Sequence, residues 1–172
     1  MRQFVAMLMV ALTSSVSAQH KEERAGIANF TRVDAVVACG GATETSALPA
    51  LKKDGFTSVI NLRVADEPSA NIDENKAEAA KVGLRYFHLP FQANAPDPAL
   101  VDRFLATVSD KANQPVYIHC GSANRVAAVW MVKRVLQDGW ATDQALTEAK
   151  AIGLTSAPLE KFAMDYIARH KK

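Results

Sequence analysis

The chain has 172 residues, a formal net charge of +2 and 22% charged residues. A chain of this length can bury the core of one domain. Its nearly balanced charge excludes the strongly basic surface typical of nucleic-acid-binding proteins. The composition is globular, with neither low-complexity segments nor internal repeats.

Residues 1–18 have the features of an export signal. Arg2 supplies a positive charge, residues 4–12 form an apolar stretch too short to cross a bilayer, and residues 16–18 fit a small-residue cleavage site before Gln19. A buried N-terminal helix is the alternative interpretation. We expect an exported product with no membrane span after cleavage, which in a bacterium means a periplasmic or secreted protein.

The rest of the chain alternates between strand and helix patterns, after a polar segment at 19–30 that we expect to be loosely ordered. Runs of apolar and β-branched residues predict strands near 31–39, 56–62, 84–91 and 116–118. Apolar residues at helical spacing predict helices at 43–53, 73–82, 98–111, from 124 onward, 142–151 and 159–170. Because helices join the strands, we expect residues 31–172 to form one three-layer α/β/α domain around a mostly parallel sheet of four to five strands.

The segment 114–126 carries the strongest chemical signal, because a buried strand, a loop of small residues and a helix follow one another there. Such a junction points backbone N–H groups and the positive end of a helix at one spot, which creates an anion-binding cradle. Cys120 opens the cradle and Arg125 closes it. A cysteine attacks as the thiolate, which this environment stabilises, and a guanidinium can grip two oxygens of a tetrahedral anion. The residues expected to bind the anion are His119, Gly121, Ser122, Ala123 and Asn124, with Arg125.

This pattern resembles the cysteine-dependent, dual-specificity-like protein tyrosine phosphatases. It is closer still to the bacterial phosphatase-like domain found alone or fused to beta-lactamase-like hydrolases. The similarity extends to residues 55–63 and 86–91, and thus covers most of the chain from about residue 33. It implies hydrolysis of phosphate monoesters such as phosphotyrosine through a thiophosphate on Cys120. Arg125 would clamp the oxyanion, Arg63 would help to bind the substrate, and the substrate would be a phosphorylated protein or a small anion.

Three features depart from the tyrosine phosphatase pattern. Four residues instead of five separate Cys120 from Arg125, Val126 stands where a Ser or Thr is usual, and Gln92 stands where an Asp acid is usual. The candidate proton donors are therefore other carboxylates. These are Asp66 and Glu67, in the polar loop 63–71, and Asp97, which we also expect to cap the helix that begins at Pro98.

Two other functions stay open at this point. The short loop has the length seen in rhodanese-like sulfurtransferases, which pass sulfur through a cysteine persulfide, and a binding module could keep the cradle without turnover. The two cysteines, Cys39 and Cys120, could form a disulfide in an oxidising compartment, although this would block the nucleophile. No group of His, Cys and acidic residues has metal-ligand spacing, so we predict no metal and no other cofactor.

Overall fold

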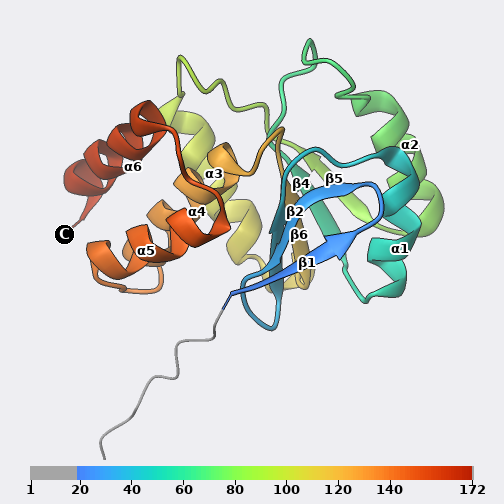
Figure 1. Cartoon of the computed structure of the whole chain (residues 1–172), viewed down its shortest axis with the longest axis horizontal. Coiled ribbons are helices and arrows are strands. Elements are labelled where there is room, and N and C mark those ends of the chain that lie inside the picture. Colours follow the sequence, from blue (N-terminus) through green and yellow to red (C-terminus); the bar gives the residue numbers. More distant parts are fainter. Residues whose placement is uncertain (1–18, 172) are drawn as a thin grey trace, which may run out of the picture.

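The structure, a computed structural model, describes residues 19–171, and within this range a six-stranded sheet lies between two layers of helices (Figure 1). Its strands are β1 (His20–Arg24), β2 (Ile27–Arg32), β3 (Val37–Gly40), β4 (Ser58–Asn61), β5 (Arg85–His88) and β6 (Val116–His119). Its helices are α1 (Leu48–Lys53), α2 (Ile72–Val82), α3 (Pro98–Ser109), α4 (Asn124–Leu136), α5 (Thr142–Ile152) and α6 (Ala157–His170), with short 3-10 turns η1 (Thr45–Ala47) and η2 (Lys111–Asn113).

The strand order β1-β2-β3-β6-β4-β5 places β6 in the middle of a parallel set formed with β3, β4 and β5. In this register Gly40, His119, Asn61 and His88 end their strands side by side. The segments that follow β3, β6, β4 and β5 therefore leave from one edge of the sheet. The α/β fold predicted from the sequence is confirmed, with more strands than the four to five expected.

The additional strands come from residues 19–30, which the sequence led us to expect as a loosely ordered segment. In the structure these residues form β1 and the first part of β2, an antiparallel hairpin added beside β3. Phe30 anchors the hairpin: its side chain is fully buried and its ring stacks on Tyr117 at 5.8 Å. Arg24 adds ion pairs to Glu22 and Asp54. The polar composition concealed a strand in which Glu22 and Arg24 are paired, while Lys21 and Glu23 are exposed.

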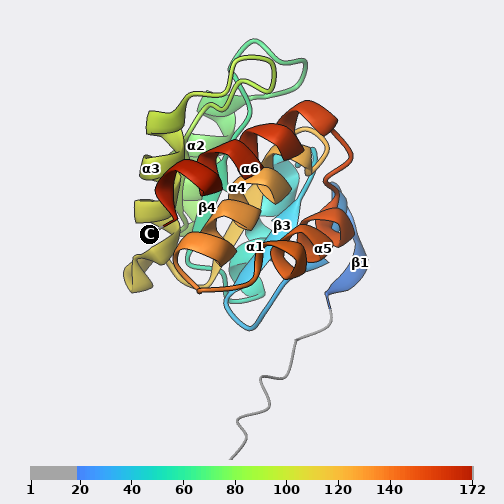
Figure 2. The ribbon, with the colours of Figure 1, turned by 90° about the vertical axis from the view of Figure 1, so that its left-hand side faces the viewer.

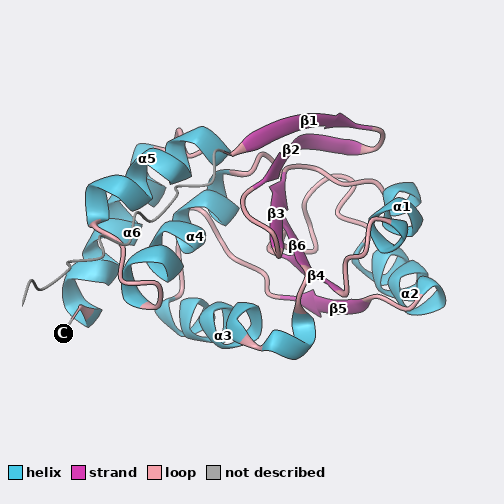
Figure 3. Ribbon diagram, turned by 90° about the horizontal axis from the view of Figure 1, so that it is seen from below, coloured by secondary structure: helices cyan, strands magenta, loops and turns pink. Residues whose placement is uncertain are grey.

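The two faces of the sheet are covered by different numbers of helices. Helices α1 and α2 cover one face, and α3 to α6 cover the other (Figure 3). On the larger side α4 lies between the sheet and the helices α5 and α6 (Figure 2). All residues from Val126 to Val135 except Lys133 are buried in it. This helix follows the cradle directly, so the site is held by the most buried helix of the domain.

The export signal predicted at residues 1–18 lies outside the described residues. Between residues 19 and 171 we find no helix with the length and apolar character needed to cross a membrane.

A buried ion cluster joins α4 to α5. Glu148 is 3% exposed, and its carboxylate accepts hydrogen bonds from Trp130 Nε1 at 2.9 Å and from Arg134 Nε at 2.7 Å. Asp34, which precedes β3, also pairs with Arg134 at 3.2 Å. Removing one partner of a buried ion pair leaves an uncompensated charge, so this cluster is a sensitive point of the fold.

We therefore expect Glu148→Leu to lower the free energy of unfolding by about 3–5 kcal/mol, because Arg134 would lose its main buried partner. Asp165→Asn is the control, since Asp165 pairs with Lys161 on the exposed side of α6, and its loss should cost less than about 1 kcal/mol. Urea denaturation of the three proteins measures the difference. Equal midpoints for Glu148→Leu and the parent would contradict the assigned role.

Candidate active site

The loop between β6 and α4 forms the floor of the site. Cys120 has no exposed surface, and Ala123, just before α4, adopts a left-handed conformation with φ 71°. A residue with a Cβ seldom takes this conformation, and such strain is typical of functional loops. Gly153 supports the turn from behind, because a Cβ on it would lie 3.2 Å from that of Ala123. The loop is thus wedged between the sheet and the connection that follows α5.

Arg125, in the first turn of α4, is fixed by three segments. Its Nη1 donates to the carbonyls of Leu62 at 3.3 Å and Phe91 at 3.2 Å, which follow β4 and β5. Both Nη atoms bind the carboxylate of Glu67, with Nη2 at 2.8 Å from Oε2. Within the described residues Nε makes no hydrogen bond. One side of the guanidinium is therefore anchored, and the Nε side remains for a ligand.

Glu67 is ionised in this arrangement. Partial burial opposes ionisation, but hydrogen bonds from Arg125 and from the Val64 N–H, and another from Arg63, lower the pKa of Glu67 to about 2. At neutral pH such a carboxylate carries no proton to donate. The expectation that Glu67 could be the acid is therefore not supported, and the geometry makes it the anchor of Arg125.

Arg63 holds the loop that carries Glu67. Its side chain is 7% exposed and donates to Glu67 Oε2 at 3.2 Å and to the carbonyl of Ser69 at 3.0 Å. Its own N–H donates to Asn61 Oδ1 at 2.8 Å. We expected Arg63 to bind the substrate, but its guanidinium is engaged by residues 67–69. It shapes the site through Glu67.

His119, which we expected among the anion-binding residues, is a core side chain. It is 1% exposed, and its ring stacks on Tyr117 with centroids 5.7 Å apart. Burial, together with the positive charge of Arg63, lowers the pKa of His119 to about 3, so the ring is neutral at physiological pH. It supports the end of β6 and contributes no positive charge to the cradle.

Gly121 and Asn124, the other loop residues with defined contacts, have different surroundings. Gly121 lies under the ion pair, because a Cβ on it would be 3.3 Å from Arg125 Nη2 and 3.4 Å from Glu67 Oε2. Asn124 turns away from the cradle: its Oδ1 accepts from the N–H groups of Thr155 at 2.7 Å and Ser156 at 2.8 Å, and its Nδ2 donates to Ser122 Oγ at 3.3 Å. The side chain of Asn124 thus fixes the α5–α6 connection, and only its backbone is available to a bound anion.

The remaining acid candidates lie on the two segments beside Arg125. Asp66 is exposed, next to Glu67. Asp97 caps α3 as predicted, accepting from the Ala99 N–H at 2.9 Å. The exposed Gln92 follows Phe91, whose carbonyl binds Arg125, so the segment 92–97 begins at the cradle. Gln92 therefore lies at the site, in the position where the tyrosine phosphatase pattern has its Asp acid.

A second loop beside the cradle was read from the sequence only as a turn. Gly40 ends β3, where a Cβ would lie 2.1 Å from the hydroxyl of Tyr117, and Gly41 passes between the carbonyls of Ala28 and Gly121. The N–H of Ala42 then donates to the Gly121 carbonyl at 2.9 Å. Two glycines at the carboxyl end of a buried strand were the signal that could have identified this loop.

The two cysteines are both free and buried, and no disulfide joins them. Cys39 is aligned with Ile118, two residues before Cys120 on the neighbouring strand. Neighbouring strands lie about 4.8 Å apart and a strand rises about 3.3 Å per residue, so these positions are roughly 8 Å apart, beyond the usual span of a disulfide.

Comparison with known proteins identifies the family. A family model described as "DSP-PTPase phosphatase fused to NAD+ Kinase" matches residues 10–163. The chain belongs to this family. It is a protein tyrosine phosphatase-like hydrolase, which confirms the resemblance inferred from Cys120 and Arg125. A search of curated proteins found no match.

Solved structures with the same fold include three phosphatases. A putative phosphatase from Shewanella putrefaciens CN-32 is 19% identical, with a TM-score of 0.70 over 86% of this chain and 96% of that one. The core of the PP-IP phosphatase SIW14 from S. cerevisiae, in complex with citrate, is 20% identical, with a TM-score of 0.67 over 80% and 85%. A cysteine-to-serine form of TpbA from P. aeruginosa, in complex with pTyr, is 19% identical, with a TM-score of 0.69 over 92% and 93%.

Gly153→Ala tests the support behind the cradle, with Gly139→Ala as its control. Both glycines have positive φ, 146° and 72°, but a Cβ on Gly139 would meet nothing within 4 Å. Each variant should lose about 1–2 kcal/mol of stability from backbone strain. Only Gly153→Ala should press on Ala123, and it should reduce kcat/KM for an aryl phosphate on the order of tenfold. Equal activity of the two variants would show that the contact does not shape the cradle.

Proposed function

We propose that this phosphatase hydrolyses phosphate monoesters, phosphotyrosine among them, through a phosphoryl group carried on Cys120. The observation that carries the proposal is the anchored guanidinium of Arg125. Its Nη atoms are held by Glu67, Leu62 and Phe91. Its Nη2 lies over Gly121, beside Cys120. Burial lowers the pKa of Arg125, but Glu67 and the neighbouring Cys120 raise it above its usual value, so the charge is permanent.

The reaction has two steps. The thiolate of Cys120 attacks phosphorus, the bond to the ester oxygen breaks, and the leaving alcohol or phenol takes up a proton. Water then attacks the phosphocysteine, releases inorganic phosphate and returns the thiolate. In both steps Arg125 and the N–H groups of residues 121–124 stabilise the charge that spreads over the non-bridging oxygens.

Glu67 is a positioning residue in this proposal, and the proton for the leaving group comes from Asp66, Asp97 or solvent. With Gln92 at the usual place of the acid, the rate depends strongly on the pKa of the leaving group. Aryl phosphates react faster than alkyl phosphates for this reason.

The first experiment separates phosphoryl from sulfur transfer. The protein is assayed with an aryl phosphate and with thiosulfate, because the short Cys120–Arg125 spacing also occurs in sulfurtransferases. We expect turnover of the phosphate ester, complete loss in Cys120→Ser, and a loss on the order of a hundredfold in Arg125→Lys, which keeps the charge but not the fork. Circular dichroism checks folding. Turnover of thiosulfate alone would replace the proposal with sulfur transfer, and no turnover of either would leave an anion-binding module.

Glu67→Gln tests the anchoring role. The variant should lose about tenfold or more in kcat, because an amide cannot hold both Nη atoms as a carboxylate does. KM should stay equal or fall, because one negative charge beside the bound anion is gone. Asp165→Asn, on the exposed side of α6, is the control and should change neither constant by more than about threefold. An unchanged kcat in Glu67→Gln would contradict the anchoring role.

A periplasmic or secreted location is part of the same proposal. Its support is the apolar stretch at residues 4–12 and the small residues 16–18. Mass spectrometry of the protein recovered from a bacterial periplasm should give a mature chain beginning at Gln19. Retention of Met1–Ala18 in the cytoplasm would contradict it.

A further inference from the structure

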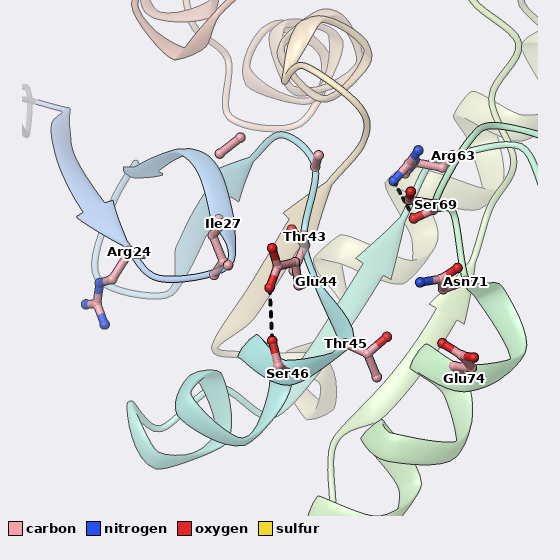
Figure 4. A pocket seen from close by; sticks show the side chains of 13 residues that line it. Arg24, Ile27, Thr43, Glu44, Thr45, Ser46, Arg63, Ser69, Asn71 and Glu74 are labelled. Atoms are coloured by element: carbon pink, nitrogen blue, oxygen red, sulfur yellow. Dashed lines mark hydrogen bonds between the residues drawn. The ribbon is translucent and has the colours of Figure 1, made fainter.

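A groove of about 720 Å³ opens beside the cradle (Figure 4). One wall consists of the β1–β2 turn and residues 42–46, and the other of the loop after β4 and the first turn of α2. Thr45 Oγ1 donates to Asn75 Oδ1 at 2.8 Å and so joins η1 to α2. Asn75 is 2% exposed, and its Nδ2 donates to the carbonyl of Ala70 at 3.0 Å. The walls are therefore fixed relative to each other, and the groove is preformed.

The groove adjoins the cradle at two points, although none of residues 119–125 lines it. Ala42 lines it and donates its N–H to the carbonyl of Gly121 at 2.9 Å. Arg63 lines it from the other wall and binds Glu67, the anchor of Arg125. A substrate whose phosphoryl group rests on the cradle thus has room for its neighbouring groups between these walls.

The charged side chains that line the groove differ in whether they have an ion-pair partner. Of its two cations, Arg24 pairs with Glu22 and Asp54, and Arg63 pairs with Glu67, which it shares with Arg125. Its two carboxylates, Glu44 and Glu74, are exposed and have no ion pair within residues 19–171. Within residues 19–171 Glu44 accepts only a hydroxyl, from Ser46 Oγ at 3.2 Å, and its carboxylate lies against the β1–β2 turn, because a Cβ on Gly26 would be 3.3 Å from Glu44 Oε2. Glu74 lies on the opposite wall, in α2 (Figure 4). The cradle is therefore positive and the adjoining groove is negative.

We infer that this groove is a specificity subsite for cationic side chains next to the phosphorylated residue, so that the substrate is a phosphorylated peptide segment with Lys or Arg beside the phosphate. The inference rests on the proposed phosphatase function and names its substrate class. Free carboxylates attract such cations and repel further phosphates or acidic residues, which selects against polyanionic substrates.

The experiment uses two phosphotyrosine peptides of equal length, one with Lys and Arg and the other with Glu at the flanking positions, and para-nitrophenyl phosphate, which has no flanking group. At low salt kcat/KM should favour the basic peptide about fivefold or more, the effect of two partly exposed ion pairs. The preference should shrink at high salt because salt screens exposed charges. The double variant Glu44→Gln/Glu74→Gln should remove the preference and leave turnover of para-nitrophenyl phosphate within about twofold. Asp165→Asn, the same change of charge on α6, should keep the preference.

The outcomes separate the two proposals. Turnover of para-nitrophenyl phosphate with equal rates for both peptides, or with a preference for the acidic one, would overturn the subsite and leave the phosphatase proposal in place. A basic preference that persists in the double variant would also overturn it. No turnover of any of the three substrates would overturn the proposed function, and the subsite with it.

Discussion

The active site depends on one ionised carboxylate placed between two arginines. Glu67 binds Arg63 within its own loop and Arg125 at the start of α4. Two like-charged guanidinium groups would repel each other, and the carboxylate between them turns that repulsion into a connection between the segment after β4 and the cradle. The half-buried position of these groups strengthens the attraction relative to water. The orientation of Arg125 is thus decided by a residue far from it in the sequence.

The parallel sheet explains why these groups meet. Because β3, β6, β4 and β5 end in register, the segments after them leave the sheet at neighbouring points. Close packing of those segments then requires small residues. Gly40 makes room for the hydroxyl of Tyr117, and Gly121 for the ion pair above it. The parallel register that brings the cradle residues together therefore also requires glycine at the positions where these segments pack closely.

The sequence predicted the α/β fold, the strand and helix at the cradle, and the pairing of Cys120 with Arg125, because these depend on local patterns and short spacing. It did not predict the β1–β2 hairpin, whose polar strands are stabilised by ion pairs and by the burial of Phe30 in the tertiary structure. It placed His119 among the anion-binding residues, but the charge of a histidine depends on burial, which spacing does not give. The roles of Arg63 and Glu67 were also hidden, since each follows from a contact with a partner that only the folded chain defines.

Arg125 has a structural role besides the catalytic one proposed for it, whereas within residues 19–171 the side chain of Cys120 has no comparable hydrogen-bond network. Its guanidinium satisfies the carbonyls of Leu62 and Phe91 and the carboxylate of Glu67. Over evolutionary time these two residues are therefore under different constraints. A descendant that no longer needs catalysis can exchange the cysteine without disturbing a hydrogen-bond network, but loss of the arginine takes from the Phe91 carbonyl its partner and from Glu67 one of its two arginines. A relative that has lost catalysis should therefore keep an arginine at the position of Arg125 after the cysteine at the position of Cys120 has been replaced.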